Sequence, residues 1–152
     1  MAKIGHVHLK VSDLKISEDF YKVLGFKVSE RVHNYLFMTF GIKHHDLALQ
    51  EIPNAAQPPE NMVGLYHFAI ELENLREIAN IYFKLKKYNI KFTPIDHGVS
   101  KAIYLSDPDG NGIEIYVDTR NESKNWKGMS NFISEEEFEK YLKDKKSNKK
   151  SN

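Results

Sequence analysis

Two short stretches with the same pattern determine the expected fold: residues 6–14 read HVHLKVSDL, and residues 67–75 read HFAIELENL. In both, apolar residues alternate with other residues, as in a half-buried strand, and an Asp or Asn that can cap a helix follows. The stretches lie 61 residues apart, and at this offset Tyr21 also falls on Tyr82. The chain therefore contains two copies of one unit.

Each copy is predicted to form a strand, a helix and three further strands, a βαβββ module. The first helix can be capped by Asp13 and ended by Gly25. The second begins with a capping box of Asn74 and Glu77. The predicted strands cover residues 4–11, 26–32, 35–40 and 47–52 in the first copy, and residues 65–72, 92–93, 102–105 and 112–117 in the second.

One module alone would leave a sheet face and an edge uncovered, so the two modules are expected to pair. The predicted fold class is α+β, with two βαβββ modules forming a curved mixed sheet and helices outside. A capping signal at Ser134 and Glu137, flanked by Ile133 and Phe138, predicts a further helix. The expected organisation is a single domain over residues 1–118 (module 1 about 3–52, linker 53–62, module 2 about 63–118), a C-terminal extension with a helix over 119–146, and a disordered tail over 147–152.

Composition excludes several classes of protein. The net charge of +1 argues against an electrostatic nucleic-acid binder, and no apolar run is long enough for a membrane span. The chain has no Cys, so disulfides, thiolate metal sites and a Cys nucleophile are excluded. The first residues enter a strand pattern without a signal-peptide core, so we expect a cytoplasmic protein that binds neither nucleic acid nor membranes.

Candidate metal ligands lie at equivalent positions of the two copies. His6 and His67 precede the apolar alternation of each first strand, and Glu114 lies on the last strand of the second copy. Two imidazoles and one carboxylate form a facial triad, which leaves coordination positions open on Fe(II). Ala48 occupies the position in the first copy that corresponds to Glu114. A fourth protein ligand is therefore absent, and the site should stay open.

The chain up to about Asp118 resembles the vicinal oxygen chelate superfamily, which includes glyoxalase I, bleomycin-resistance proteins and type I extradiol dioxygenases. The resemblance rests on the first repeat and on the stretch from Phe20 to Phe26, which contains Phe-Tyr-x-x-Leu-Gly-Phe. It implies the paired-module fold without specifying the reaction.

Two further motifs resemble those of the extradiol dioxygenases. The segment 97–114 has the His, the apolar-Tyr pair, the Pro-x-Gly turn and the Glu of their signature, and residues 43–49 resemble the stretch that carries their acid/base histidine. By this resemblance His6, His67 and Glu114 would bind Fe(II), with Mn, Ni or Zn as other options. His45 would be the acid/base, and His97 and Tyr104 would line the substrate pocket.

The expected function is that of a metal-dependent extradiol dioxygenase, which opens a catechol-type aromatic diol with O2. Larger extradiol enzymes have two paired-module domains and this chain has one, so the pocket is expected either to be more open or to be closed by the partner subunit of a homodimer. Two alternatives stay open at this point. One is a glyoxalase-like lyase or isomerase, or a thiol transferase, on the same fold. The other is a metal-free protein that binds drugs, like the bleomycin-resistance proteins.

Overall fold

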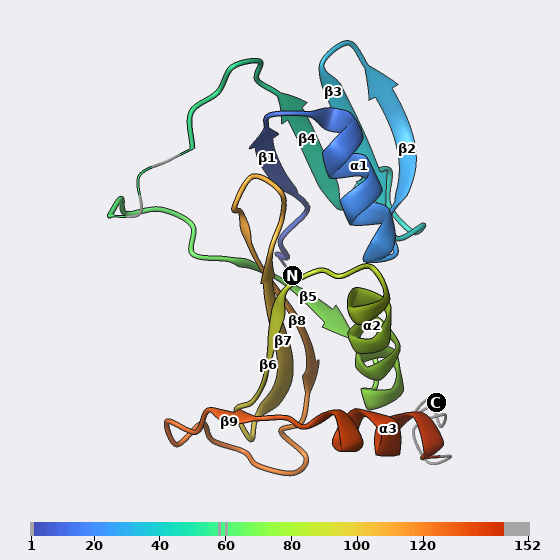
Figure 1. Ribbon diagram of the computed structural model, residues 1–152, viewed down its shortest axis with the longest axis vertical. Coiled ribbons are helices and arrows are strands. Elements are labelled where there is room, and N and C mark those ends of the chain that lie inside the picture. The colour runs from blue at the N-terminus through green and yellow to red at the C-terminus, as the bar shows by residue number, and fades with distance from the viewer. Residues whose placement is uncertain (1, 58, 60, 145–152) are drawn as a thin grey trace. The chain divides into compact units, whose positions relative to one another are not determined.

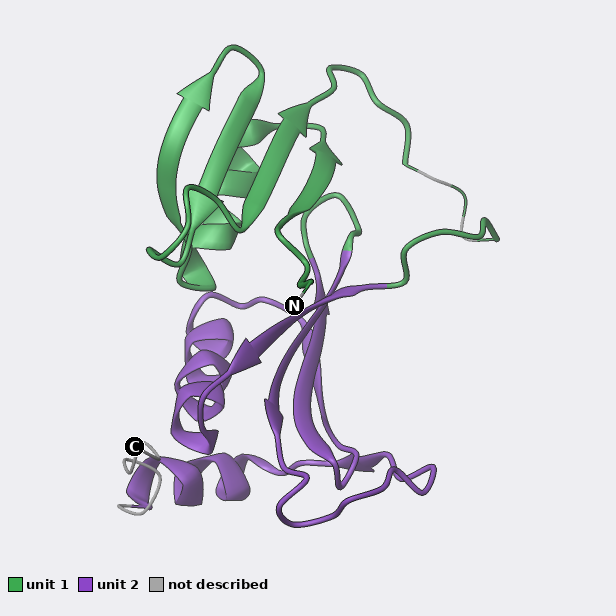
Figure 2. Ribbon diagram, turned by 180° about the vertical axis from the view of Figure 1, so that it is seen from behind, with its two compact units in different colours: residues 1–66, 107–111 green, residues 67–106, 112–152 purple. Residues whose placement is uncertain are grey.

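The computed structural model describes residues 2–57, 59 and 61–144. Within this part of the chain, no helix is long and apolar enough to cross a membrane. The chain divides into two units, one with residues up to 66 together with 107–111, and the other with residues 67–106 and those from 112 onward (Figure 2). In chain order the elements are β1 (Val7–Val11), α1 (Leu14–Val23), β2 (Lys27–Val32), β3 (Tyr35–Thr39), β4 (Leu47–Glu51), β5 (Phe68–Leu72), α2 (Leu75–Lys87), β6 (Phe92–Asp96), β7 (Ser100–Ser106), β8 (Gly112–Asp118), β9 (Asn131–Phe132) and α3 (Glu135–Lys143) (Figure 1).

The first unit contains a four-stranded mixed sheet in the order β1-β4-β3-β2, with β1 parallel to β4. Leu9, Leu36 and Leu49 are buried and lie at paired positions on one face, where α1 packs against β3 and β4. Ala48 pairs with both His8 and Phe37, so these side chains share the opposite face. The alternation in β1 thus directs Leu9 and Val11 into the core and His8 away from it.

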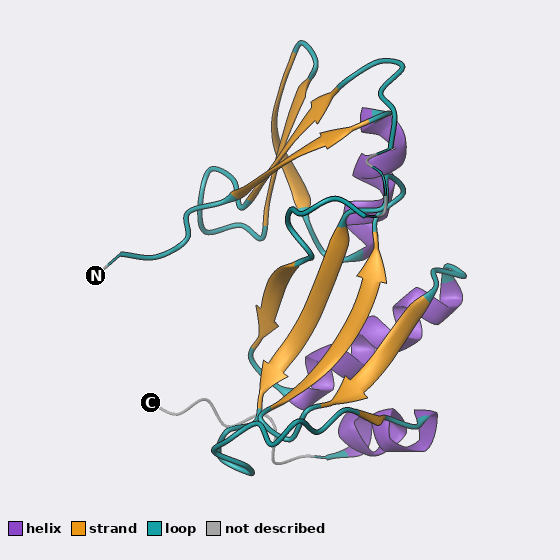
Figure 3. Ribbon diagram, turned by 90° about the vertical axis from the view of Figure 1, so that its left-hand side faces the viewer, coloured by secondary structure: helices purple, strands orange, loops and turns teal. Residues whose placement is uncertain are grey.

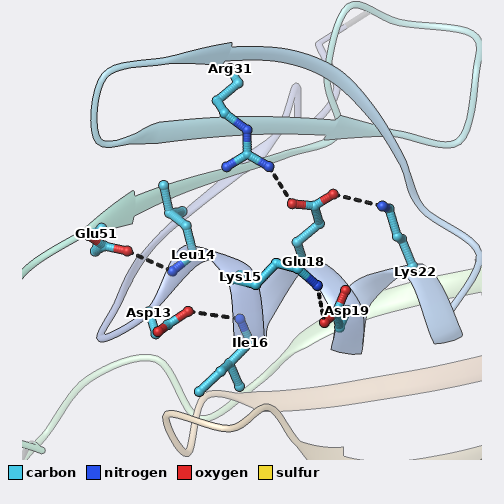
Figure 4. Close-up of polar contacts among 9 residues, drawn as sticks. All are labelled: Asp13, Leu14, Lys15, Ile16, Glu18, Asp19, Lys22, Arg31 and Glu51. Carbon is cyan, nitrogen blue, oxygen red and sulfur yellow. Dashed lines mark hydrogen bonds and ion pairs between the residues drawn. The ribbon is translucent and has the colours of Figure 1, made fainter.

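Hydrogen bonds set both ends of α1, and Figure 4 shows those at its start. The Asp13 carboxylate accepts from the Ile16 N–H at 2.8 Å, and Glu51 accepts from the Leu14 N–H at 2.8 Å. At the other end Gly25 has a φ of +102°, and Phe26 N–H bonds the Tyr21 carbonyl at 3.2 Å. This is a Schellman motif, which requires the left-handed conformation that glycine adopts without a steric penalty.

The second unit contains a five-stranded mixed sheet in the order β5-β8-β7-β6-β9, with β5 parallel to β8. One face of this sheet carries α2, as Figure 3 shows. The ring of Tyr82 on α2 stacks on Phe138 of α3 at 4.1 Å between ring centroids. Ile113 and Ile115 of β8 are buried, and the residues that alternate with them point to the opposite face.

The α+β fold class is confirmed, and the hydrogen bonds sort the strands into two mixed sheets, one per module. Asn74 caps α2 as predicted, since its side chain accepts from the Glu77 N–H. The Glu77 carboxylate accepts from the Glu73 N–H and not from the Asn74 N–H that the predicted capping box would use. The C-terminal helix forms after Ser134, but the Ser134 side chain makes no capping hydrogen bond. The tail predicted over 147–152 lies outside the described residues.

Both first strands begin later than predicted. The strand expected over 4–11 starts at Val7, and the strand expected over 65–72 starts at Phe68. Ile4, Leu65 and Tyr66 are 84%, 69% and 87% exposed. These residues lie before the first paired positions of the two sheets, so the sequence pattern alone places the strand boundaries too early.

Candidate functional site

The helix-free face of the second sheet brings several of the predicted residues together. Glu114 on β8 pairs with Ala69 on β5 and with Tyr104 on β7. Side chains at paired positions point to the same face of a sheet. His67 directly precedes β5 and lies two residues from Ala69, which places it on this face too.

A chain of polar contacts links these side chains. The Nε2 atom of His67 lies 3.0 Å from Oε2 of Glu114. The Tyr104 hydroxyl donates to the other oxygen, Oε1, at 2.9 Å, and His97 Nε2 lies 2.9 Å from the same hydroxyl. His67 and Glu114 have side chains that are 28% and 15% exposed, so they are reachable but largely desolvated. We call His67, Glu114, Tyr104 and His97 the polar relay.

The far side of His97 contacts residues that the sequence did not indicate. Its Nδ1 atom lies 2.9 Å from the Met129 carbonyl oxygen and 3.3 Å from Ser130 Oγ. The Trp126 Nε1–H donates to the same Met129 carbonyl at 2.8 Å. Met129 acts through its backbone, which every residue type has, so no sequence motif could have identified it.

The first unit carries the other histidines of the prediction. The His6 and His45 rings lie 4.5 Å apart, and His45 also contacts the Phe37 ring at 5.0 Å. His44 Nδ1 lies 2.8 Å from His45 Nδ1, and His44 Nε2 lies 2.9 Å from a Glu30 carboxylate oxygen. Glu30, which the sequence did not single out, therefore orients the two adjacent histidines.

The surroundings of His45 favour its neutral form. Burial lowers the pKa of His45 below its ordinary value, and the nearby His6 and His44 lower it further. A desolvated imidazole beside other imidazoles is harder to protonate. His45 can thus accept a proton near neutral pH.

The structure brings together two of the three proposed metal ligands. His67 and Glu114 are in contact in the second unit, and His6 belongs to the first unit. Among the described residues, no group of three or more His, Cys, Asp or Glu side chains is close enough to hold a metal ion. The complete triad stays a prediction, as do the roles of His45, His97 and Tyr104.

The residues present fit a divalent transition metal. The Nε2 atom of His67 and a carboxylate oxygen of Glu114 lie 3.0 Å apart on a partly desolvated face, and Fe(II) binds both kinds of ligand atom. The second carboxylate oxygen is hydrogen-bonded by Tyr104. Outer hydrogen bonds of this kind orient ligating side chains in metal sites.

Known proteins are similar to this chain in sequence. Catechol-2,3-dioxygenase from Bacillus subtilis (strain 168) is 43% identical over 117 residues, which cover 76% of this chain and 41% of that protein. Biphenyl-2,3-diol 1,2-dioxygenase 2 from Rhodococcus globerulus is 35% identical over 119 residues, with 76% of this chain and 63% of that protein covered. The chain thus spans less than two thirds of either relative.

A solved structure agrees at the level of the fold. The glyoxylase/bleomycin resistance protein/dioxygenase domain from Frankia sp. EAN1pec superposes with a TM-score of 0.65 at 22% identity, and the match covers 78% of this chain and 93% of that one. Residues 3–115 also match a family profile, and this range contains both strand-helix repeats and the polar relay. By these matches the chain belongs to the Glyoxalase/Bleomycin resistance protein/Dioxygenase superfamily.

Proposed function

We propose that this protein is a metal-dependent extradiol dioxygenase, which opens the ring of a catechol-type aromatic diol with O2. The observation that carries the proposal is the polar relay, in which Tyr104 joins His97 to a carboxylate already in contact with His67. Two relatives named as dioxygenases of catechol and of biphenyl-2,3-diol support the same reaction class.

His67, Glu114 and His6 are the side chains proposed to hold the metal, with Fe(II) as the first choice and Mn, Ni or Zn as other options. When bound, Fe(II) would supply open coordination positions for the diol and O2 and would lower the pKa of the diol hydroxyls. Glu114 keeps one oxygen for Tyr104, so the hydrogen bond can orient the carboxylate while the other oxygen serves the metal.

His45 is proposed to accept a proton from the diol and to return it later. Its lowered pKa keeps the imidazole neutral and able to accept. Phe37, whose ring contacts His45, gives an aromatic substrate an apolar surface beside the base.

Tyr104 and His97 are proposed to stabilise negative charge that develops on the substrate oxygens. A hydroxyl can donate to a developing oxyanion, and His97 can replace the proton through Nε2. The pair can therefore donate without leaving a phenolate in the pocket.

The test is oxygen uptake by protein loaded with Fe(II) under anaerobic conditions, measured on a panel of catechols that includes a biaryl diol. The proposal predicts uptake together with absorbance from a ring-opened product. A glyoxalase-like lyase would act without consuming O2. Absence of uptake, with tight drug binding by metal-stripped protein, would contradict the proposal and favour the drug-binding class.

A further inference from the structure

We infer that the segment 119–132 of the C-terminal extension is a positioning element for His97, and that Trp126 is its key side chain. The segment lies beyond residues 3–115, which match the superfamily. Figure 1 shows it in orange along the end of the second sheet before α3. We call it the His97 clamp.

The clamp is attached to the sheet on both sides of His97. At its start, Thr119 Oγ1 donates to the Gly98 carbonyl at 2.7 Å, and the Thr119 N–H bonds the Val99 carbonyl at 2.9 Å. At its end, β9 pairs with β6, with Phe132 opposite Ile95. The residues between these two anchors must therefore pass beside His97.

An ion pair between a buried lysine of β7 and the clamp adds to the first anchor. The Lys101 side chain is only 8% exposed, and its ammonium lies 3.0 Å from Asp96 and 3.4 Å from Glu122 of the clamp. The pKa of Lys101 is raised: burial alone would lower it, but Asp96 and Glu122 more than offset this. The contact with Glu122 joins the clamp to β7, while Asp96 keeps the Lys101 ammonium paired within the sheet.

The clamp also approaches the backbone next to His97 closely. Gly98 has a φ of +76°, and a Cβ at this position would lie 3.0 Å from Met129 Cε. The positive φ favours a glycine, because other residues would be strained in this conformation, and the Met129 methyl group would have to shift to admit a Cβ. Met129 thus lies against Gly98 through its side chain and against His97 through its carbonyl.

The contact determines which nitrogen of His97 carries a fixed proton. A carbonyl oxygen only accepts hydrogen bonds, so the Met129 carbonyl at 2.9 Å keeps a proton on Nδ1. Nε2 is then the nitrogen free to exchange a proton with Tyr104. Trp126 donates to the same carbonyl and holds it in this orientation, which makes Trp126 a positioning residue.

The test is nitrogen-15 NMR of the imidazoles at a pH at which His97 is neutral, with the His97 signals identified from a His97→Gln variant. The clamp predicts a protonated Nδ1 and an unprotonated Nε2 in the parent protein. In Trp126→Phe, which keeps a ring but loses the N–H, the Met129 carbonyl is released. Ser130 can then donate to Nδ1, and the tautomer with the proton on Nε2 gains population. Lys127→Ala, an exposed change in the same segment, should leave the tautomer unaltered.

A proton on Nε2 in the parent protein would overturn the inference. An unchanged tautomer in Trp126→Phe would overturn the role of Trp126. The effect on catalysis rests on the proposed function. In Trp126→Phe, kcat is expected to fall about tenfold, with little change in KM. Because NMR needs no turnover, a tautomer shift in a protein without oxygen uptake would leave the clamp standing while refuting the dioxygenase. Oxygen uptake by the parent protein, together with an unchanged tautomer in Trp126→Phe, would support the dioxygenase and refute the role of Trp126.

Discussion

The Tyr104 hydroxyl has one proton and contacts both His97 Nε2 and Glu114 Oε1, each at 2.9 Å. When the hydroxyl donates to Glu114, the contact with His97 requires Nε2 to donate. When Nε2 is unprotonated, as in the tautomer that the Met129 carbonyl favours, the hydroxyl can donate to His97 instead. The Tyr104 proton can therefore move between the carboxylate and the imidazole.

Replacing Tyr104 tests this residue-scale role. Tyr104→Phe should lower kcat for catechol cleavage by about 10- to 100-fold, because it removes the hydroxyl between His97 and the carboxylate. Tyr116 offers a matched control, since its hydroxyl donates to Glu71 at 3.1 Å on the same sheet. Steady-state kinetics should find Tyr116→Phe close to the parent. Equal losses in both variants would show that the effect is structural.

At the scale of elements, the two modules begin with the same device, a strand followed by a helix with a side-chain cap. Asp13 caps α1 and Asn74 caps α2. At the helix ends Gly25 and Asn89 both have positive φ, so each helix stops in the left-handed conformation. The side-chain caps and the left-handed residues determine where each helix begins and ends.

The α1 cap should have a measurable effect on stability. Asp13→Ala should lower the free energy of unfolding by about 1 kcal/mol, because the Ile16 N–H loses its acceptor. Asp19→Ala, which removes an exposed partner of Lys15, should change it by less than about 0.5 kcal/mol. Urea denaturation curves provide both values. If Asp13→Ala lowers the free energy of unfolding no more than Asp19→Ala does, the Asp13 cap does not stabilise α1.

Glu18 on α1 gives the stability a dependence on pH. Hydrogen bonds from Lys22 and Arg31 lower the pKa of Glu18 below the ordinary 4.5, against an opposing effect of burial. The stabilisation is therefore complete above pH 4.5 and is lost as the pH falls through the folded pKa. Thermal melts should show a smaller acid-induced drop in Tm for Glu18→Gln than for the parent or for the exposed-site control Glu136→Gln. An equal drop in all three would refute the role of Glu18.

The sequence predicted the elements well and the contacts of the site only in part. The repeat of residues 6–14 indicated both modules, because helix caps and strand alternation are local signals. The two-residue strand β9 was missed because so short a segment has no periodicity. The Met129 carbonyl and Glu30 were missed because their roles depend on which segments meet in space.

At the scale of the whole molecule, the matches span 41% and 63% of the lengths of the two dioxygenase relatives. The segment before β5 is apolar and exposed: Met62, Val63 and Leu65 are 65%, 100% and 69% accessible. Exposed apolar clusters of this kind mark association surfaces. We propose a homodimer, with a second copy of the chain in contact with this segment.

Light scattering tests the dimer. The parent protein should have twice the mass of a single chain, and Val63→Asp should shift the equilibrium toward the monomer, since a charge in an apolar contact is costly. Lys127→Ala serves as a surface control. A monomeric parent protein, or a dimer indifferent to Val63→Asp, would contradict this use of the segment.

We propose that Glu114, which accepts from Tyr104 and contacts His67, belongs to an iron site that cleaves diols. The most direct test compares Glu114→Gln with Glu71→Gln, two like changes to carboxylates that each accept a tyrosine hydroxyl on the same sheet. Bound Fe(II) and oxygen uptake per mole of catechol are measured in both. The account predicts equal consumption of O2 and catechol in the parent and in Glu71→Gln, with loss of iron and uptake in Glu114→Gln. Full iron binding and turnover in Glu114→Gln would contradict it.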